Sequence, residues 1–444
     1  MKYFLTVFIC KTSKIIIKLL GKNATTFPGQ LALKLCPDIG KYLSRQVKKE
    51  IISVMGTNGK TTTNNLLASC YEKAGYKVVC NRLGANMYQG VIASFLDNCS
   101  MFGKLSADYA CLEMDEAWAN VITKDVVPNK IIITNLFRDQ LDRYGEIEGT
   151  MNYLKKAIKN SPNAVLVLNA DDPLVVATAG EFENQKLYFG IKNAYKEYKA
   201  RIKDGQHCYN CHKNLQYNFY HFGHIGDYFC ECGFKRPQID FGAENISVYP
   251  NVAFDVAGIG RLELNGRGLY NIYNILASGC SAYHSGIENE YIIKCAKEYT
   301  PQIGRMECFT INNKKVYLIL AKNPAGFNQS VGTVNEDPSE KDVLIAINDN
   351  AQDGVDISWL WDVDFDDLIN DKVKSFSVSG KRYLDMSLRL KYEGVDENRI
   401  ILMPDIKSGI RNLLKKDTDS LYILSNYTAI FEIRKILTEL LKKF

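Results

Sequence analysis

The stretch EIISVMGTNGKTTTNNLLASCYEKAGY, residues 50–76, decides the fold of this chain. The segment EIISVM (50–55), in which Ile51, Ile52, Val54 and Met55 are apolar, is typical of a buried strand. Beyond the glycine loop, apolar side chains recur at helical spacing, namely Leu66, Leu67, Cys70, Tyr71 and Ala74. The stretch therefore predicts a strand, a phosphate-binding loop and a helix, although Val54 stands where the usual P-loop pattern has its first glycine.

The loop contains the groups that a triphosphate requires even without a glycine at position 54. Glycines allow backbone N–H groups to turn inward, a lysine contacts the β and γ oxygens, and a hydroxyl binds Mg²⁺. Gly56, Gly59, Lys60 and Thr61 supply these groups. We interpret the loop as a nucleotide site, with a fortuitous glycine turn as the alternative.

Further strands are predicted at residues 109–114, 130–136 and 164–169, separated by lengths that suit helical crossovers. This alternation indicates an α/β domain with a mostly parallel sheet. The segment YACLEMDEAW (109–118) ends its strand with Glu113, Asp115 and Glu116. Ligands bind at the carboxyl ends of such strands, and Mg²⁺ prefers oxygen ligands. Glu113 is the predicted magnesium ligand, and the alternative is an ordinary surface carboxylate.

Composition and charge indicate a globular protein of about three domains. The 444 residues are 46% hydrophobic, and thirteen cysteines at irregular spacing do not form a small secreted disulfide framework. We therefore expect a reducing, cytoplasmic compartment. Residues 1–50 contain ten Lys or Arg and two acidic residues, Asp38 and Glu50. The remaining 394 residues carry 45 basic and 48 acidic side chains.

The basic N-terminal segment, residues 1–49, is also apolar, but Lys11, Lys14 and Lys18 interrupt it too early for a membrane span. Two interpretations remain open. The segment can form a helix that lies on an anionic membrane surface, or a helix that packs on its own domain.

A cysteine cluster predicts a structural zinc site. Cys208-x-x-Cys211 and Cys230-x-Cys232 are separated by a segment of hairpin length, so that each pair can occupy one edge of a tetrahedron. Free thiols and a catalytic metal are the alternatives, and a neighbouring histidine could replace one ligand: His207, His212, His221 or His224. We expect the aromatic residues of this segment to form a small core. A ribbon of this kind can also bind nucleic acid, for which Lys213, Lys235 and Arg236 are candidate phosphate contacts.

A second alternation of strands and helices follows residue 301 and predicts another open α/β domain, Rossmann-like, to residue 444. Its polar loop contains Asp349, Asn350, Asp353 and Asp356 just beyond a strand, without the spacing of a calcium loop. No cysteine lies in a G-x-C-x-G elbow, and SGCSA around Cys280 comes nearest. A G-x-C-x-G elbow normally holds the cysteine that hydrolyses glutamine. If this protein uses ammonia, the ammonia would therefore come from solution or from another protein.

Several motifs together resemble the Mur ligase superfamily of ATP-dependent amide ligases. They are GTNGKTTT (56–63), TNLFRDQLDRYGE (134–146), NADDP (169–173), NGRGLYNIYNILAS (265–278), GRME (304–307) and AKNPAG (321–326). The resemblance implies that an acyl phosphate forms and an amine displaces the phosphate. It implies ATP contacts from Gly56, Thr57, Asn58, Gly59, Lys60, Thr61, Thr62, Asn271, Asn274 and Arg305, and Mg²⁺ ligands from Thr61 and Glu113. Two departures are residues 139–142, DQLD in place of D-H-L-D, and Lys322 in place of a histidine.

Three further features resemble one family within this superfamily, the MurT family of ligase subunits. They are the cysteine insertion and the segments INDNAQDGVDISWLWDVDF (347–365) and SGKRYLDMSLRLKYEG (379–394). That family, with a GatD-type glutaminase, amidates the α-carboxyl of D-glutamate in the stem peptide of lipid II. The resemblance implies that Asp349 orients the partner's catalytic histidine across the interface, as an aspartate does in a triad. It implies ATP, Mg²⁺ and structural Zn²⁺, a lipid II substrate, and a cytoplasmic protein at the inner face of the membrane.

The predicted organisation is a basic segment at 1–49, a Mur ligase-like ATP-binding domain at 50–300 and a C-terminal domain at 301–444. A zinc-ribbon insertion is expected at about 201–237 within the second of these. Two other functions stay open: a ligase that adds an amino acid to a cell-wall precursor or folate, and a zinc-ribbon ATPase that binds nucleic acid. The acidic main body argues against the latter, and no nucleic acid is expected.

Overall fold

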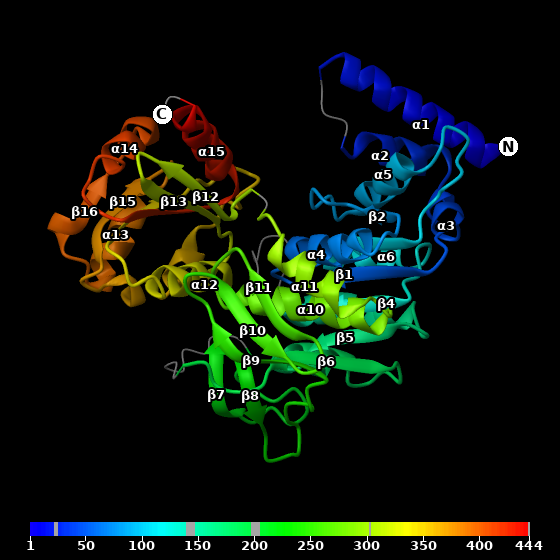
Figure 1. The fold of residues 1–444 in the computed structure, drawn as a ribbon, viewed down its shortest axis with the longest axis horizontal. Coiled ribbons are helices and arrows are strands. Elements are labelled where there is room, and N and C mark those ends of the chain that lie inside the picture. Colours follow the sequence, from blue (N-terminus) through cyan, green and yellow to red (C-terminus); the bar gives the residue numbers. More distant parts are fainter. Residues whose placement is uncertain (22–24, 139–146, 197–204, 302, 443–444) are drawn as a thin grey trace.

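The computed structural model describes residues 1–21, 25–138, 147–196, 205–301 and 303–442. Its described strands form a nine-stranded sheet, a six-stranded sheet and a two-stranded hairpin. Figure 1 shows the two large sheets in separate lobes, with the C-terminal lobe beside the one that contains the phosphate loop. The prediction of an α/β fold with parallel-rich sheets is confirmed.

The first sheet has the order β11-β10-β9-β6-β5-β4-β1-β3-β2. Its strands are β1 (Glu50–Met55), β2 (Val78–Cys80), β3 (Tyr109–Glu113), β4 (Lys130–Ile133), β5 (Val165–Asn169), β6 (Lys186–Ile191), β9 (Phe241–Ser247), β10 (Val252–Val256) and β11 (Gly260–Leu264). The pairs from β2 to β9 are parallel, whereas β10 and β11 are antiparallel. The antiparallel edge extends the parallel sheet that the sequence predicted.

Both faces of this sheet are covered by helices, which explains the continuous apolar strands. One face packs on α4 (Lys60–Lys73), α10 (Tyr270–His284) and α11 (Asn289–Lys297). The other packs on α5 (Tyr88–Asn98), α6 (Glu116–Ile122), α8 (Ile147–Lys159) and α9 (Pro173–Ala179). Successive residues of β1 alternate between the two cores, with Ile52 and Val54 in one and Ile51 and Met55 in the other.

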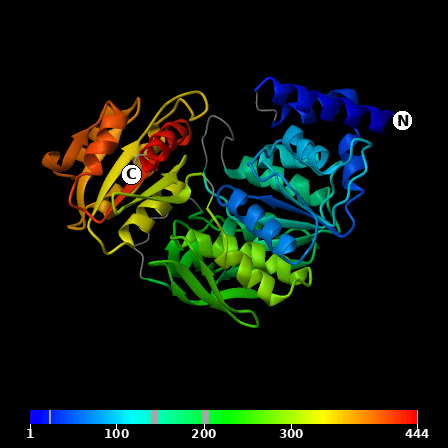
Figure 2. The same cartoon turned by 45° about the horizontal axis from the view of Figure 1, so that its top comes forward.

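The N-terminal segment forms three helices, α1 (Lys2–Leu19), α2 (Phe27–Leu35) and α3 (Ile39–Ser44). Val7, Cys10 and Ala32 join the core on the α5 side of the sheet. Figure 2 shows α1 as the outermost of these helices. Among the helices that the structure describes, none is both long and apolar enough to cross a membrane.

The second sheet has the order β12-β13-β17-β14-β15-β16, parallel except between β12 and β13. Its strands are β12 (Arg305–Ile311), β13 (Lys314–Leu320), β14 (Lys341–Ala346), β15 (Val373–Ser379), β16 (Ile400–Leu402) and β17 (Ser420–Ser425). The helices α12 (Pro324–Asn335) and α13 (Tyr383–Glu393) cover one face, and α14 (Ile406–Leu413) and α15 (Tyr427–Leu441) the other. Short 3₁₀ helices are η1 (Ser358–Asp362), η2 (Phe365–Leu368) and η3 (Glu397–Arg399).

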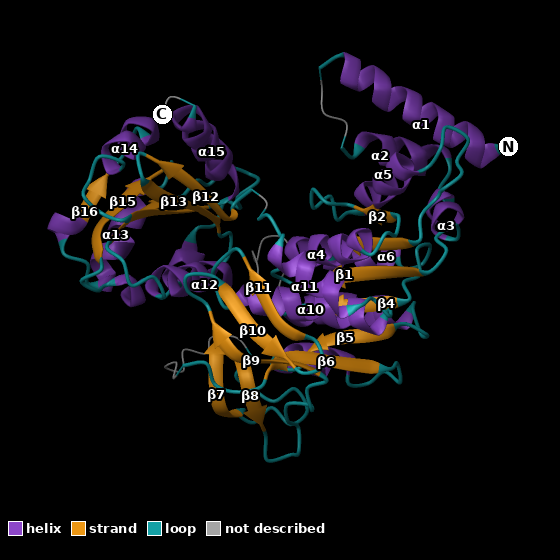
Figure 3. Ribbon diagram, viewed as in Figure 1, coloured by secondary structure: helices purple, strands orange, loops and turns teal. Residues whose placement is uncertain are grey.

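The predicted insertion contains the hairpin β7 (Gln216–Phe222) and β8 (Ile225–Phe229), which Figure 3 shows at the edge of the first lobe. Its residues 201–204 lie outside the described residues. Cys208, Leu215, Tyr228 and Cys230 form a small core with Val176 of α9. The expected aromatic core is present only in part. Tyr217 packs on this core and stacks on Tyr220 with ring centroids 4.2 Å apart, whereas Tyr209 is exposed and Phe222 packs on the core of the main sheet. Whether residues 1–49, 50–300 and 301–444 are independent domains stays a prediction.

Candidate active site

The phosphate loop connects the end of β1 to the start of α4. Gly56 and Gly59 have φ angles of +117° and +84°. A Cβ on Gly56 would lie 2.4 Å from Thr134 Oγ1, and one on Gly59 would lie 2.2 Å from Asn274 Oδ1. Both positions therefore require glycine for conformation and for space.

Val54 occupies the position of the first glycine in the usual P-loop pattern. It lies within β1, is fully buried, and pairs in register with Glu113 of β3 and Ile132 of β4. Because the turn begins two residues later at Gly56, a side chain at position 54 contributes to the core and leaves the loop unobstructed.

Lys60 is folded back onto its own loop. Its Nζ donates to the carbonyl oxygens of Gly56 at 2.5 Å and Thr57 at 3.3 Å, and to Glu116 Oε1 at 2.9 Å. The same carboxylate oxygen accepts from Gly56 N at 2.8 Å. Burial raises the pKa of Glu116, while the neighbouring ammonium of Lys60 opposes that shift. Glu116 thus holds both the lysine and the first glycine of the loop.

Glu113 presents a carboxylate oxygen to the pocket. Its Oε1 accepts from Asn86 Nδ2 at 3.0 Å, whereas its buried Oε2 has no hydrogen-bond partner among the residues that the structure describes. A Cβ on Gly84 would lie 3.6 Å from Thr61 Oγ1 and 3.7 Å from Glu113 Oε2, so both oxygens border the same space. A buried unpartnered carboxylate oxygen beside a hydroxyl is a donor set that suits Mg²⁺.

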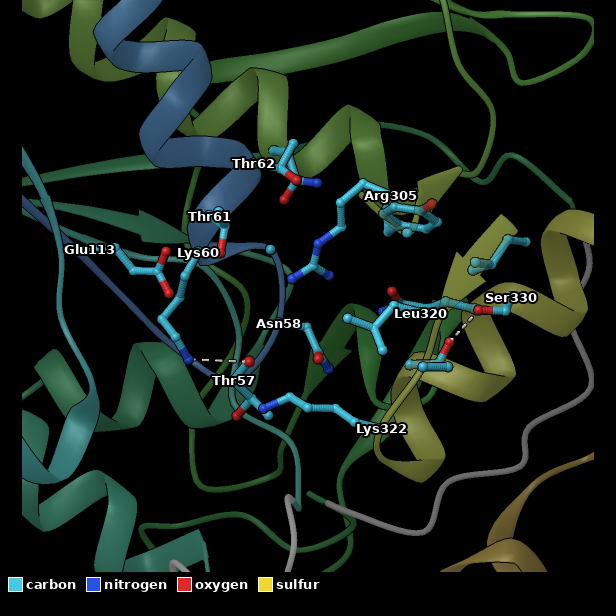
Figure 4. A pocket seen from close by; sticks show the side chains of 18 of the residues that line it. Thr57, Asn58, Lys60, Thr61, Thr62, Glu113, Arg305, Leu320, Lys322 and Ser330 are labelled. Atoms are coloured by element: carbon cyan, nitrogen blue, oxygen red, sulfur yellow. Dashed lines mark hydrogen bonds between the residues drawn. The ribbon is translucent and has the colours of Figure 1, made fainter. Parts of the chain in front are cut away.

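The C-terminal lobe closes the other side of this pocket. Arg305, Lys322, Gln329 and Ser330 line it opposite the phosphate loop. Figure 4 shows the Arg305 side chain extending toward the loop and Lys322 reaching toward Thr57. Beside the pocket, Asn323 Nδ2 of the C-terminal lobe donates a hydrogen bond of 3.4 Å to Asn58 Oδ1 of the phosphate loop. The pocket is therefore built from both lobes.

The structure brings most of the predicted nucleotide residues together. Thr57, Asn58, Gly59, Lys60, Thr61, Thr62, Asn274 and Arg305 line one pocket, with Glu113. Gly56 lies just behind at the loop's start. Asn271 does not line the pocket, because its side chain donates to Arg267 O at 2.7 Å and accepts from Asn274 Nδ2 at 3.1 Å. It supports Asn274 from behind, and its contact with nucleotide stays a prediction.

Sequence reasoning missed Asn86, Tyr270, Gln329 and Ser330 as pocket residues, and gave Glu116 no contact with Lys60. AKNPAG (321–326) already marked the turn into α12, so Gln329 and Ser330, one to two turns along the helix, could have been found. The DQLD sequence at 139–142 lies outside the described residues.

The four predicted cysteines meet in one cluster. The Sγ atoms of Cys208, Cys211, Cys230 and Cys232 all lie within 4.8 Å of one another. Four thiolates at 2.3 Å from zinc would be separated by roughly 3.8 Å, so the cluster fits a closed tetrahedral site. In the described part of the chain, this is the one group of three or more metal-binding side chains that meets. No histidine belongs to it.

The neighbouring histidines and cations have other contacts. Buried His224 lies 3.3 Å from Asp172 Oδ1, and burial lowers the pKa of His221 to about 3. Arg236 pairs with Asp171 at 3.1 Å and Asp227 at 3.0 Å, and Lys213 pairs with Glu231. Two of the three cations considered for nucleic-acid contact are therefore engaged within the protein.

Asp349 lies beyond the end of β14, far along the chain from the phosphate loop. Its Oδ2 is 3.4 Å from Arg382 Nη1, and a quarter of its side chain is exposed. Asp353 has a structural role, because its Oδ1 accepts from Thr428 N at 2.8 Å and the residue is buried. Asp349 is thus the more accessible carboxylate. Cys280 is buried within α10, which agrees with the absence of a nucleophile elbow.

The lobes, the phosphate loop and the pocket between them define a Mur ligase. A model of the Mur ligase middle domain matches residues 54–282, and a model of the MurT ligase C-terminal domain matches residues 320–430. The computed fold is similar to a pseudomurein peptide ligase type C from Methanothermus fervidus, with a TM-score of 0.71 and 24% identity over 92% of this chain and 84% of that chain. It is also similar to the MurF ligase from Thermotoga maritima in complex with ADP, with a TM-score of 0.64 and 15% identity over 93% and 84% of the two chains.

More particularly, the chain belongs to the MurT family. It is 34% identical to the lipid II isoglutaminyl synthase (glutamine-hydrolyzing) subunit MurT of Staphylococcus aureus strain COL, over 91% of each chain. It is 32% identical to the subunit of the same name from Streptococcus pneumoniae, over 96% of this chain and 95% of that protein.

Proposed function

We propose that this protein is the ligase subunit of a lipid II isoglutaminyl synthase. It amidates the α-carboxyl of D-glutamate in the stem peptide of lipid II, using ATP and ammonia from a glutaminase partner. The observation that carries this assignment is the family relationship over nearly the whole chain, combined with an intact phosphate pocket between two lobes.

The pocket supports transfer of the γ-phosphoryl group to the glutamate carboxylate. Mg²⁺, held by Thr61 Oγ1 and Glu113 Oε2, would neutralise phosphate charge. Lys60 and Arg305 approach from opposite lobes and stabilise charge on the transferred group. Ammonia then attacks the acyl carbon, the carbon–oxygen bond to phosphate breaks, and the amide loses a proton. Closure of the lobes excludes water from the acyl phosphate.

The four-cysteine cluster would hold zinc in a structural role. All four positions of a tetrahedral ion would be filled by sulfur, so no open position would remain for substrate. The hairpin β7–β8 and its small core then form a ribbon that zinc would stabilise, because so few residues bury little apolar surface by themselves.

The surface beside Asp349 suits a glutaminase of the GatD type. Arg382, which pairs with Asp349, immediately precedes α13. Leu384, Leu388 and Tyr392 are exposed at four-residue intervals along that helix. An apolar stripe beside a partly exposed carboxylate is a suitable protein interface. Asp349 would accept a hydrogen bond from the partner's catalytic imidazole and fix its tautomer.

We place the protein in the cytoplasm and at the inner surface of the membrane, where the lipid-linked substrate is found.

The assay that tests this function measures ADP release and product mass with lipid II, purified ligase and its co-purified partner. Amidation requires glutamine together with the partner, or ammonium ions with the ligase alone, and adds one nitrogen in place of one oxygen. ADP release that depends instead on a free amino acid would identify an amino-acid-adding ligase. Stimulation of ATP hydrolysis by DNA or RNA would overturn both assignments.

A further inference from the structure

The outer face of α1 is apolar along its whole length. Its exposed side chains are Phe4, Leu5, Phe8, Ile9, Ile15, Ile16 and Leu19, and the following Leu20 is also exposed. At 100° per residue these positions occupy one continuous side of the helix, with Thr12 at its centre and Lys2 at its edge as the polar residues. Leu19 and Leu20 are 81% and 69% exposed.

The opposite side of α1 contains lysines that turn inward. Lys11 Nζ donates to the carbonyl oxygens of Leu96, at 3.0 Å, and Cys99, while Lys14 pairs with Asp97. A surface helix of a soluble protein normally turns its apolar stripe to the core and its charges to water. In α1 the arrangement is reversed. The ammonium groups of Lys11 and Lys14 contact the protein beneath the helix, and the apolar side chains face outward.

Neighbouring segments extend the apolar surface beyond α1. Phe102 is 70% exposed and stacks on Phe4, with ring centroids 5.6 Å apart. Phe27 and Leu35, at the two ends of α2, are also exposed. A contiguous exposed apolar surface of this kind marks an interaction site. We name these eight α1-face residues with Phe102 the outer apolar face.

Basic side chains accompany this face. Exposed cations are Lys18 at the end of α1, Lys34 on α2, Lys41 on α3 and Arg45 just after it. The two acids nearest to α1 are already paired, Asp38 with Lys2 and Asp97 with Lys14. The local charge is therefore positive, complementary to an anionic lipid surface.

We propose that α1 lies in the plane of an anionic lipid bilayer and inserts its outer apolar face among the acyl chains. The helix is about 27 Å long at 1.5 Å per residue, and its apolar side is uninterrupted except at Thr12, which suits a fluid apolar phase. A protein partner would be expected to match polar groups on this face, and α1 offers almost none. The helix cannot span the bilayer, so it binds at the surface.

This inference deepens the proposed function, on which it rests for the lipid-linked nature of the substrate. Binding through α1 would place the protein on the same surface as lipid II. It would raise the effective concentration of substrate at the pocket without any change in the chemistry.

The test is co-sedimentation of the full-length protein with vesicles of phosphatidylglycerol and phosphatidylcholine, without nucleotide or partner. Wild-type protein is expected to bind, with binding at least tenfold weaker to pure phosphatidylcholine and lowered by high salt. Phe8→Glu/Ile15→Glu, two exposed positions on the face, is expected to weaken binding to anionic vesicles at least tenfold. Tyr283→Glu/Leu402→Glu is the matched control, because both side chains are exposed outside α1. Thermal unfolding of each variant confirms that it is folded.

Amidation provides a second readout. With lipid II in vesicles, Phe8→Glu/Ile15→Glu should slow turnover several-fold, whereas a water-soluble stem-peptide substrate should be amidated at the wild-type rate. Vesicle binding that is absent in the wild type, or unchanged in the face variant, overturns the proposal. So does a face that instead mediates self-association, detected by concentration-dependent sedimentation that the variant abolishes. None of these outcomes affects the amidation assay with soluble substrate, so the two proposals fail separately.

Discussion

Thr57 and Phe137 exchange two hydrogen bonds across the base of the phosphate loop. Phe137 N donates to Thr57 Oγ1 at 3.0 Å, and the hydroxyl donates to Phe137 O at 3.1 Å. The Phe137 ring in turn packs against His224, with centroids 4.6 Å apart, and against Phe222. Phe222 ends β7, and His224 lies in the turn of the β7–β8 hairpin. Phe137 therefore connects the cysteine-bearing insertion to the nucleotide loop.

We expect Thr57→Val to weaken ADP binding by up to roughly thirtyfold, because two neutral hydrogen bonds contribute about 1 kcal/mol each and valine conserves the shape. Thr57→Ser keeps the hydroxyl and should bind within about twofold of wild type. Isothermal titration calorimetry measures both. Equal affinity of the valine variant would show that Phe137 does not position the loop.

Removal of the metal should weaken nucleotide binding as well as stability. Mass spectrometry of the native protein is expected to show one zinc ion, which Cys211→Ser should reduce. The variant should unfold at a lower temperature and bind ADP more weakly, since the hairpin would no longer hold Phe137. Cys308→Ser, at an exposed cysteine outside the cluster, is the matched control. A zinc-free variant with normal ADP affinity would separate the ribbon from the site.

The sequence predicted the elements that depend on neighbouring residues. Apolar residues on both faces of β1 indicate a buried strand, and Gly56 and Gly59 indicate a tight turn because glycine adopts its backbone conformation. Asn86 escaped notice because it reaches Glu113, 27 positions away, only after the chain crosses from β2 to α5. Asn271 and Asn274 are three residues apart on one helix, and their motif cannot show which of them faces the pocket. Only the three-dimensional arrangement shows that Asn86 contacts Glu113 and that Asn274, not Asn271, lines the pocket.

Stability should depend on the pH through Asp171. This fully buried carboxylate accepts from Arg236 Nη1 and from Tyr273 Oη at 2.7 Å, yet burial raises its pKa to about 6. A raised pKa means that the folded state binds the proton more tightly than the unfolded state. The contribution of Asp171 is therefore fully present below pH 4 and is lost as the pH rises to about 6.

The free energy of unfolding of the wild type, compared with that of Asp171→Asn, isolates this effect. Relative to the variant, the wild type should lose roughly 3 kcal/mol of stability between pH 4 and pH 7, and the difference should stay constant above pH 7. Urea titrations at several pH values measure it. A difference that does not vary with pH would mean that Arg236 keeps the group ionised throughout.

Asp349→Asn should separate the two half-reactions. ADP binding and amidation with free ammonium are expected to stay at wild-type levels, because the residue lies outside the nucleotide pocket. Glutamine hydrolysis by the complex should fall at least 100-fold, since an amide would favour the wrong tautomer of the partner's histidine. Asp364→Asn is a control for charge loss in the same lobe. Normal glutamine hydrolysis would remove Asp349 from the interface mechanism.

The contact between Lys60 and Glu116 predicts opposite effects for two acidic residues beside the phosphate loop, Glu113 at the end of β3 and Glu116 at the start of α6. Glu116 competes with phosphate for the ammonium of Lys60, whereas the buried oxygen of Glu113 has no hydrogen-bond partner in the described part of the chain and is positioned for Mg²⁺. Glu116→Gln keeps an acceptor for Gly56 N but removes a negative charge near a polyanionic ligand. ATP should then bind more tightly by on the order of tenfold, the size of a unit-charge interaction at about 10 Å with an effective dielectric constant near 20.

Glu113→Gln should instead weaken ATP binding in the presence of Mg²⁺ and leave metal-free binding unchanged, because it loses a ligand for the cation. Lys60→Ala should reduce amidation at least 100-fold with or without either change, since it removes the ammonium of the phosphate loop that would stabilise the transferred phosphoryl group. Fluorescence titration with and without Mg²⁺ distinguishes the three variants. If Glu116→Gln and Glu113→Gln weaken binding equally, both carboxylates serve the metal and the proposed competition for Lys60 is wrong.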